Sequence, residues 1–410
     1  MIHVCYCFCD KTGRYAKFAA TSMLSLLENT KTEVTVHILH DNTLTEDNRD
    51  KFSYIANRYE QTVQFYNLSK LCPDKIAKII NMVPEIEKST STVGTFYKLL
   101  IPQALPEEIK KAVFIDPDTI VNLDIDELWQ VELEDKVLGA VTEVAVGTNS
   151  AKAFLLCSGG IVNEENYFNC GVLLMNLDVL REDEDIIMQG VKFRGYNPKQ
   201  KFFEQTVLNY CFSEQALKLP EKFNYPVKIV RQSENPDVER KIYHYTTGSS
   251  RMGLEMNDPC NALWFSYFIK TPFFNEKVIG QLYERLQKIR TELKEVPLKL
   301  SAIMPGKMRV FFIEPQKVDS MKKFFSIKDY EEIILAENED SFQKLIDTMQ
   351  NSKGMCVFFI LTEKFLKKKF PFDRLKKEGF TEGKDFIKAW TFLSEAQGVT
   401  FNSYSFIQEM

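Results

Sequence analysis

An apolar run that ends in two carboxylates constrains this chain more than any other feature. Residues 113–121 read Val-Phe-Ile-Asp-Pro-Asp-Thr-Ile-Val, so Asp116 and Asp118 lie between two stretches typical of buried parallel strands. Ligands of open α/β sheets bind beyond the carboxyl ends of such strands. Pro117 fixes its own φ angle and favours extended backbone at Asp116. The segment therefore predicts an α/β fold in which two acids are held ready to share one divalent cation.

A simpler interpretation of the acid pair stays open at this point. Acids that follow a strand often cap the next helix or lie in a solvated turn. Short motifs of this kind also match by chance. The choice between a metal site and a turn depends on what the rest of the chain supplies.

The first part of the chain alternates between strand and helix patterns. Strand-like segments at 2–8, 34–39 and 62–66 alternate with helix-like segments at 15–27 and 45–58. This rhythm predicts a doubly wound, mostly parallel sheet. Further segments follow: strands at 137–141, 171–175 and 241–245, a helix at 206–212, and an irregular stretch at 148–165 that predicts a loop over a site. No Gly-x-Gly-x-x-Gly segment follows the first strand, which argues against a dinucleotide-binding fold.

The pattern changes after position 280 and predicts three parts. We expect a catalytic-type α/β domain at 1–280, a charged helical linker at 281–300 and a small α/β domain at 301–410. In the last part, strands are predicted at 308–313 and 355–361, and helices at 330–335 and 342–349. Its segment 378–387 resembles a short element of bacterial polysaccharide-biosynthesis proteins. Membrane positioning, partner binding and a structural or dimerising role all remain open for it.

Composition and charge exclude several classes of protein. Of the 410 residues, 44% are apolar, which is ample for a large core. The net charge of −5 argues against a nucleic-acid binder. Apolar runs stay below the roughly 20 residues that span a bilayer, and the first residues lack the features of a signal peptide. Cys5, Cys7 and Cys9 alternate on one strand, where small apolar packing is expected, so we expect free thiols and a cytoplasmic protein.

A lysine-rich stretch at 364–369 (KFLKKK) has two interpretations. It is compatible with peripheral contact to an anionic membrane surface at the inner face of the membrane. A solvated helix face is the alternative. The sequence is also compatible with a homo-oligomer.

Several segments accompany the acid pair in a fixed order along residues 1–275. They are 7–10 (CFCD), 96–102 (FYKLLIP), 116–118 (DPD), 167–177 (YFNCGVLLMNL), 204–209 (EQTVLN), 242–248 (IYHYTTG) and 263–267 (LWFSY). In this order they resemble the family-8 glycosyltransferases, whose most specific block reads YFNAGVLLMNL. The resemblance implies a GT-A fold with a Rossmann-like, mostly parallel sheet. It also implies transfer of a hexose from a UDP-sugar to a glycan acceptor, such as a lipopolysaccharide or capsule, with retained anomeric configuration.

The resemblance also assigns roles to individual residues. The implied metal ligands for Mn²⁺ or Mg²⁺ are Asp116, Asp118 and His244, a donor set that suits these ions. The implied donor contacts are Asp10, Lys98, Asp116, Gly248 and Arg251, and the implied catalytic residues are Gln205, Glu204 and Asn169. Capping of the next helix is the alternative role for Asp10, and holding a turn is the alternative for Asn169. His3, His37 and His40 are expected to be ordinary strand or loop residues.

Three positions depart from the family pattern. Lys98 stands where arginine is usual and holds phosphate only as a point charge. Glu204 stands where aspartate is usual, and the loop that begins at Gly248 lacks the usual Pro-Trp. These changes keep a second class in view, a non-catalytic protein that binds sugar nucleotides or serves as a scaffold. A phosphatase of the haloacid-dehalogenase type also uses Asp-x-Asp, but there Gly-Thr usually follows on the first strand, and here Thr119-Ile120 follows.

Overall fold

The computed structural model describes most of the chain in two compact units. Described are residues 1–13, 15–88, 92–143, 164–182, 184–198, 202–234, 236–246, 252, 258–275, 278, 308–325, 327, 329, 331–352, 355–362, 364–366, 368–382 and 384–388. The first unit holds those up to 275, and the second holds those from 278 on. The predicted linker at 281–300 lies outside these ranges, so the division into three parts stays a prediction.

A seven-stranded sheet forms the centre of the first unit, with the order β3-β2-β1-β4-β7-β6-β8. Its strands are β1 (Ile2–Cys7), β2 (Val34–His40), β3 (Thr62–Asn67), β4 (Lys111–Ile115), β6 (Leu138–Thr142), β7 (Phe168–Asn176) and β8 (Ala216–Lys218). All neighbours pair in parallel except β7, which runs antiparallel to both β4 and β6. The predicted α/β fold with a mostly parallel sheet is confirmed. The reversal at β7 brings the start of that strand to the carboxyl end of β4.

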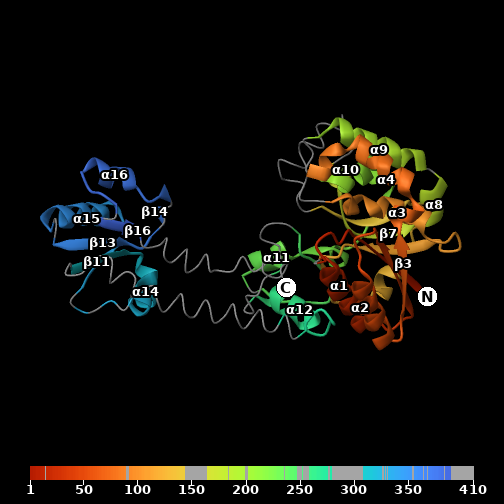
Figure 1. Cartoon of the computed structure of the whole chain (residues 1–410), viewed down its shortest axis with the longest axis horizontal. Coiled ribbons are helices and arrows are strands. Elements are labelled where there is room, and N and C mark those ends of the chain that lie inside the picture. The colour runs from red at the N-terminus through yellow and green to blue at the C-terminus, as the bar shows by residue number, and fades with distance from the viewer. Residues whose placement is uncertain are drawn as a thin grey trace. The chain divides into compact units, whose positions relative to one another are not determined.

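Helices cover both faces of this sheet (Figure 1). They are α1 (Ala16–Asn29), α2 (Glu46–Arg58), α3 (Leu68–Leu71), α4 (Pro73–Met82), α5 (Ile101–Ala104), α6 (Asp126–Trp129), α8 (Leu177–Glu182), α9 (Glu184–Tyr196), α10 (Phe203–Phe212), α11 (Val227–Gln232) and α12 (Pro259–Phe268). In Figure 1, α1 and α2 lie on one side of the sheet and α4, α9 and α10 on the other. Helix α2 has a polar exposed face, and Thr45 caps its start with a side chain that accepts from the N–H of Asn48. Helix α1 is buried almost all round because α2 and α12 also contact it.

A second sheet has three strands in the order β5-β10-β9. Its strands are β5 (Thr119–Val121), β9 (Tyr225–Pro226) and β10 (Ile242–His244). Strand β10 pairs antiparallel with β5, in a register that places His244 opposite Thr119. The small sheet therefore carries the end of β10 to the segment that follows β4.

The three alternating cysteines lie in the core, as expected from their spacing. Cys5, Cys7 and Cys9 are buried in one apolar cluster with residues of β4 and β7. They are free thiols, and burial raises the pKa of Cys9 to about 11. Small apolar packing is therefore their structural role.

His37 is buried and lies in a chain of hydrogen bonds that favours its neutral form. Tyr66 donates to Gln64 (2.6 Å), so its hydroxyl accepts from His37 Nδ1 (3.1 Å), and His37 Nε2 then accepts from His3 (3.0 Å). Burial lowers the pKa of His37 to about 3, and the nearby charge of His3 adds to this effect. Folding therefore excludes a proton that the unfolded chain binds below about pH 6.5.

We expect His37→Gln to weaken the acid sensitivity of this unit. Because the folded pKa of His37 is depressed, its contribution to stability is lost as the pH falls from about 6.5 towards 3, with a slope of at most about 1.4 kcal/mol per pH unit. Glutamine does not titrate in this range, so the unfolded variant no longer binds a proton at position 37. Urea unfolding curves at several values between about pH 7 and pH 4 measure the slope. Parallel curves for the two proteins would contradict the assignment.

The second unit is a small α/β fold of its own. A parallel sheet with the order β12-β11-β13-β16 is formed by β11 (Met308–Ile313), β12 (Glu332–Leu335), β13 (Cys356–Ile360) and β16 (Phe386–Lys388). The helices in its described part are α14 (Val318–Phe325), α15 (Glu339–Asn351) and α16 (Phe372–Lys377). Buried phenylalanines dominate its core, among them Phe312, Phe342, Phe358 and Phe386. Helix α15 begins with a reciprocal cap between Asn338 and Ser341.

Two expectations for this unit were wrong. Residues 330–335 were predicted as a helix, but Glu332–Leu335 form strand β12, because Ile333 and Ile334 have β-branched side chains that suit the pairing with β11. The lysine-rich stretch is not a helix face. It forms a short antiparallel hairpin of β14 (Lys364–Phe365) and β15 (Lys368–Lys369), in which Phe365 is buried in the core.

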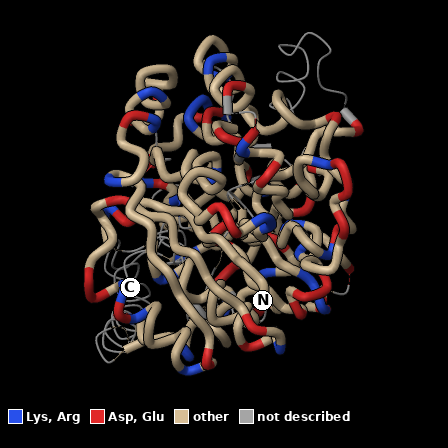
Figure 2. Tube along the Cα trace, turned by 90° about the vertical axis from the view of Figure 1, so that its right-hand side faces the viewer, with Lys and Arg blue, Asp and Glu red and all other residues tan. Residues whose placement is uncertain are grey.

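Acidic and basic residues are interspersed along the chain. On the face that Figure 2 shows, the two signs alternate over the described part of the trace rather than gathering by sign. This mixture fits the net charge of −5. Within the described ranges, every helix is too short or too polar to span a bilayer.

Candidate active site

The Asp-Pro-Asp segment forms a turn between β4 and β5 that the rest of the unit holds in place. The N–H of Asp116 donates to the carbonyl of Gly171 on β7 (2.7 Å). The hydroxyl of Thr119 donates to the carbonyl of Asp116 (2.9 Å). The N–H of Tyr245 donates to the carbonyl of Asp118 (2.8 Å). Backbone bonds to two different sheets therefore fix both acids.

A buried chain of hydroxyls supports the same turn from helix α1. Because Thr119 donates to Asp116, its oxygen accepts from Ser22 (2.8 Å), and Ser22 in turn accepts from Tyr6 (3.1 Å). All three hydroxyl residues have no exposed surface. Each buried donor is satisfied, so the chain adds rigidity without an unpaired polar group.

His244 completes a group of three metal-type ligands with the two acids. Its Nε2 lies 3.3 Å from Asp118 Oδ1 and 3.8 Å from Asp116 Oδ2. One ligand atom from each residue lies within 4.8 Å of the others. Ligands at adjacent positions around a small divalent cation are about 3 Å apart, given metal–oxygen distances near 2.1 Å. The spacing and the mixture of carboxylates and imidazole fit such a cation.

The pKa values of Asp116 and His244 also fit a site for a divalent cation. Burial raises the pKa of Asp116 to about 6, while the Lys98 ammonium acts against this shift and the charge of Asp118 adds to it. Burial has the largest single effect on His244 and acts to lower its pKa, but the charge of Asp118, the hydrogen bond to Asp118 and the charge of Asp116 together outweigh burial, and the pKa is raised. Two acids and a histidine thus crowd together, and a proton on His244 relieves their repulsion. A divalent cation could replace that proton.

Gly171 allows His244 to approach strand β7. A Cβ atom at this position would lie 2.1 Å from Cε1 and 2.5 Å from Nδ1 of the imidazole ring. Real Cβ atoms do not tolerate such contacts. The glycine of the YFNCGVLLMNL segment is therefore required by the position of the histidine and not by its own backbone angles.

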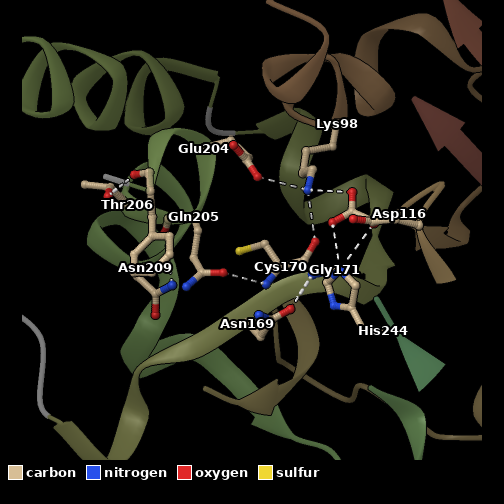
Figure 3. A network of polar contacts seen from close by, with 12 residues as sticks. Lys98, Asp116, Asn169, Cys170, Gly171, Glu204, Gln205, Thr206, Asn209 and His244 are labelled. Carbon is tan, nitrogen blue, oxygen red and sulfur yellow. Dashed lines mark hydrogen bonds and ion pairs between the residues drawn. The ribbon is translucent and has the colours of Figure 1, made fainter. Parts of the chain in front are cut away.

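Lys98 is the buried cation of the site (Figure 3). Its Nζ donates to Asp116 Oδ1 (3.1 Å), to Glu204 Oε1 (3.2 Å) and to the carbonyl of Cys170 (3.1 Å). Burial alone would lower the pKa of Lys98, but the charges of Asp116 and Glu204 raise it above its ordinary value. Lys98 therefore stays charged and holds the first metal-type acid and Glu204 together.

Gln205 and Asn169 lie on the other side of Cys170 (Figure 3). Gln205 accepts from the N–H of Cys170 (3.2 Å) and donates to Glu143 (3.1 Å) and to the hydroxyl of Tyr167 (3.1 Å). Asn169 accepts from the N–H of Gly171 (2.8 Å) and donates to the same oxygen of Glu143 (2.6 Å). Both amides are oriented by backbone donors of β7.

Asp10 is engaged by its own surroundings. Its Oδ1 accepts from the N–H groups of Tyr15 (2.7 Å) and Ala16 (3.1 Å) at the start of α1, and its Oδ2 accepts from Asn48 (2.9 Å). Helix capping, the alternative weighed for this residue, is thus what the structure displays. A carboxylate offers about four acceptor positions, so further acceptor capacity remains for a ligand.

The structure brings together most of the residues singled out in the sequence. Asp116, Asp118, His244, Lys98, Glu204, Gln205 and Asn169 form one connected network, and Asp10 lies after β1, the neighbour of β4. Gly248, Arg251 and the loop expected at 148–165, except for residues 164 and 165, lie outside the described residues. The sequence analysis missed Glu143, Asn224 and Thr119. Unlike the acid pair at 116 and 118, a single acid after a strand carries no distinctive signal, and neither does an asparagine in a turn or a threonine in a strand.

A cation held by Asp116, Asp118 and His244 would, together with the nearby ammonium of Lys98, stabilise negative charge on a ligand. The site also presents an oriented amide, Gln205, in a setting where buried groups are satisfied by hydrogen bonds. This combination suits the departure of a phosphate-type leaving group.

Comparison with known proteins identifies related chains. The sequence model described as glycosyl transferase family 8 matches residues 6–250. Lipopolysaccharide 1,2-glucosyltransferase of Escherichia coli is 28% identical over 242 residues, covering 54% of this chain and 63% of that protein. General stress protein A of Bacillus subtilis is 23% identical over 253 residues, covering 60% and 82%. The chain spans less than two thirds of the length of the Escherichia coli relative.

Solved structures show the same fold. The galactosyltransferase LgtC, solved in complex with donor and acceptor sugar analogues, matches with a TM-score of 0.54 at 18% identity, covering 68% of this chain and 99% of that one. The bifunctional glycosyltransferase WbbM matches with a TM-score of 0.51 at 16% identity, covering 67% and 50%. Identities this low establish the fold alone, and the predicted GT-A fold is confirmed.

Proposed function

The chain belongs to glycosyltransferase family 8, and from this premise we propose that it transfers a hexose from a UDP-sugar to a glycan acceptor. The observation that carries the proposal is the cluster of Asp116, Asp118 and His244 beside the buried ammonium of Lys98. Oxygen ligands with one imidazole suit Mn²⁺, and Mg²⁺ as a substitute. Such a cation would neutralise the diphosphate that departs with UDP.

The donor would lie across the carboxyl ends of β1 and β4. Lys98 supplies a fixed positive charge next to the leaving diphosphate, and Glu204 supplies an acceptor for sugar hydroxyls. Asp10 offers its remaining acceptor capacity to the uracil or the ribose, and Asp116 also contacts the ribose. Gly248 and Arg251 complete the proposed donor contacts, with the guanidinium of Arg251 on a phosphate.

We infer that the anomeric configuration is retained. Gln205 would lie beside the anomeric carbon, where its amide oxygen is a feeble nucleophile. An amide at this place favours transfer on the front face through an oxocarbenium-like state over a covalent double displacement, so the two-carboxylate arrangement of retaining glycosidases does not apply. Asn169 would contact the donor sugar or the acceptor hydroxyls.

The acceptor class is proposed from a relative. The Escherichia coli relative is a lipopolysaccharide 1,2-glucosyltransferase, which supports a lipopolysaccharide, capsule or related surface glycan as the acceptor. We also propose a cytoplasmic location, supported by buried free thiols. Peripheral contact at the inner face of the membrane would use the lysine-rich hairpin at 364–369.

A panel of UDP-sugars with Mn²⁺, Mg²⁺ or chelator tests the function. We expect UDP with Mn²⁺ to raise the melting temperature by mass action and one UDP-hexose to release UDP slowly even without acceptor. Release should stop in chelator and return when metal is restored. Proton NMR of the released or transferred sugar then reports its anomeric configuration.

The outcomes of this screen separate the two classes of function. Stabilisation by UDP and metal with no turnover of any UDP-sugar would favour a non-catalytic binding or scaffold protein. Equal turnover in chelator and in Mn²⁺ would remove the metal from the mechanism.

A further inference from the structure

A continuous chain of side-chain hydrogen bonds connects the two halves of the site. It runs from His244 to Asn224 (3.0 Å), from Asn224 to Asn169 (2.7 Å), from Asn169 to Glu143 (2.6 Å), and from Glu143 to Gln205 (3.1 Å). His244 belongs to the metal cluster, and Gln205 lies at the proposed reaction centre. Asn224 and Glu143 are the members of this chain to which the sequence assigned no role, and Asn224 is the one that contacts His244.

The direction of each bond follows from one backbone group. The N–H of Gly171 can only donate, so the atom of Asn169 that faces it is Oδ1. Asn224 meets this same oxygen and must present its Nδ2 there. Its Oδ1 is thereby turned towards Nδ1 of His244, which must carry a proton to make the bond. The lone pair of neutral His244 is then left on Nε2, the atom that faces Asp116 and Asp118.

The other end of the chain is fixed in the same way. The N–H of Cys170 donates to Gln205 Oε1, so Gln205 presents its Nε2 to Glu143. Asn169 presents its Nδ2 to the same carboxylate oxygen. Two neighbouring N–H groups of β7 therefore determine the orientation of every amide between the metal cluster and Gln205.

We propose that Asn224 is a positioning residue that selects the tautomer of His244 for metal binding and, through Asn169 and Glu143, aligns Gln205. The inference rests on the proposed function and deepens it. Second-layer partners of this kind orient a metal-ligating histidine, and their loss typically costs about 10- to 100-fold in affinity or activity. Asn224 is 3% exposed and lies immediately before β9, which pairs with the histidine strand β10, so its place relative to His244 is set by backbone pairing.

The asparagine side chain of residue 224 offers both a hydrogen-bond acceptor and a hydrogen-bond donor, and the site uses both. It accepts from His244 with one atom and donates to Asn169 with the other. Aspartate would keep the acceptor but present an oxygen to Asn169 Oδ1, which repels it. Alanine would remove both contacts. The two substitutions therefore distinguish the histidine half of the chain from the amide half.

The experiment compares Asn224→Ala, Asn224→Asp and wild type in three measurements. Free Mn²⁺ is counted by electron paramagnetic resonance to give the metal affinity. Nitrogen-15 NMR of the imidazole rings, of which the chain has four, reports the tautomer of His244 in the Mg²⁺-loaded protein. Steady-state kinetics with the active UDP-sugar separate kcat from KM. Asn197→Ala serves as a matched control, because Asn197, directly after helix α9, also donates a side-chain bond, to the carbonyl of Phe193.

For Asn224→Ala we expect the Nδ1–H signature of His244 to disappear and the Kd for Mn²⁺ to rise about 10- to 100-fold. For Asn224→Asp we expect the signature and the Kd to stay within about threefold of wild type, while kcat falls at least about tenfold at an unchanged KM. The control should match wild type throughout. A melting temperature near that of wild type shows that each variant is folded.

Two results would overturn the inference. One is an Asn224→Ala protein that keeps the wild-type tautomer and Mn²⁺ affinity. The other is an Asn224→Asp protein with the full kcat. If the wild type turns over no UDP-sugar, the proposed function fails on that ground alone, and the tautomer and Mn²⁺ measurements still decide the role of Asn224.

Discussion

Asp118→Asn is expected to lower the kcat/KM for the UDP-sugar by at least about 10²-fold, because it removes one of two carboxylates from the cation site. The amide keeps the shape of the side chain but not its charge. It also removes the negative charge that raises the pKa of His244, so the histidine loses its pairing with Asp118 as well. The affinity for Mn²⁺, measured by calorimetry or paramagnetic resonance, should fall together with the rate.

An aspartate on the surface provides the matched control for this variant. Asp135 is 83% exposed and its carboxylate lies 3.9 Å from Lys136, a distance at which an exposed pair contributes little. Asp135→Asn should therefore behave as wild type in both measurements. Mn²⁺-dependent release of UDP at the wild-type rate by the Asp118→Asn protein would refute the metal assignment.

Gly171→Ala is expected to abolish tight Mn²⁺ binding while the chain still folds. The new methyl group would overlap the imidazole ring of His244, at 2.1 Å from Cε1. His244 must then turn away, and its ligand atom leaves the two acids. We expect a rise of at least about 100-fold in the Kd for Mn²⁺ and a loss of stability of about 1–3 kcal/mol from overpacking. Calorimetric titration and urea unfolding measure the two effects.

A second glycine in the same sheet makes the comparison specific. Gly139 lies on the neighbouring strand β6, where a Cβ would meet Leu219 at 3.1 Å, at the flexible end of that side chain. Gly139→Ala should leave Mn²⁺ binding unchanged. In the double variant Gly171→Ala/His244→Ala, both contacts with the imidazole are gone and only the contact with Asn169 Oδ1 at 3.0 Å is left, so its stability should lie close to that of His244→Ala. Additive losses in that pair of variants would show that the methyl group clashes with something other than His244.

Much of this fold could be predicted from the sequence, because apolar residues mark its strands and helices clearly. The strand at 308–313 was predicted at its observed bounds, and those at 34–39 and 62–66 were each one residue short. The hydrophobic alternation of such segments depends on burial, which a single sequence records. The prediction of a helix at 330–335 was wrong, because a segment of six residues covers fewer than two helical turns and does not separate a strand pattern from a helix pattern.

The two acids of the candidate site could be predicted from the sequence, but the residues that hydrogen-bond around them could not. Asp116 and Asp118 follow a buried strand in sequence, so the carboxyl-end rule locates them. Asn224 and Glu143 come from distant parts of the chain and reach the site only through the pairing of β9 with β10 and the reversal at β7. Such contacts depend on tertiary register, which short-range patterns do not encode. The direction of strand β7 was likewise undetermined by its composition.

The anchoring of the Asp-Pro-Asp turn has a consequence for how an ion enters. Thr119, Gly171 and Tyr245 hold the turn through hydrogen bonds that are complete without any ligand. The conformational entropy of ordering these two acids is therefore lost when the protein folds and not when the ion arrives. Entry of a divalent cation into this part of the site would then depend on how fast the cation sheds its own water. Mg²⁺ dehydrates reluctantly, so ion exchange rates, more than rearrangement of the turn, would distinguish one cation from another here.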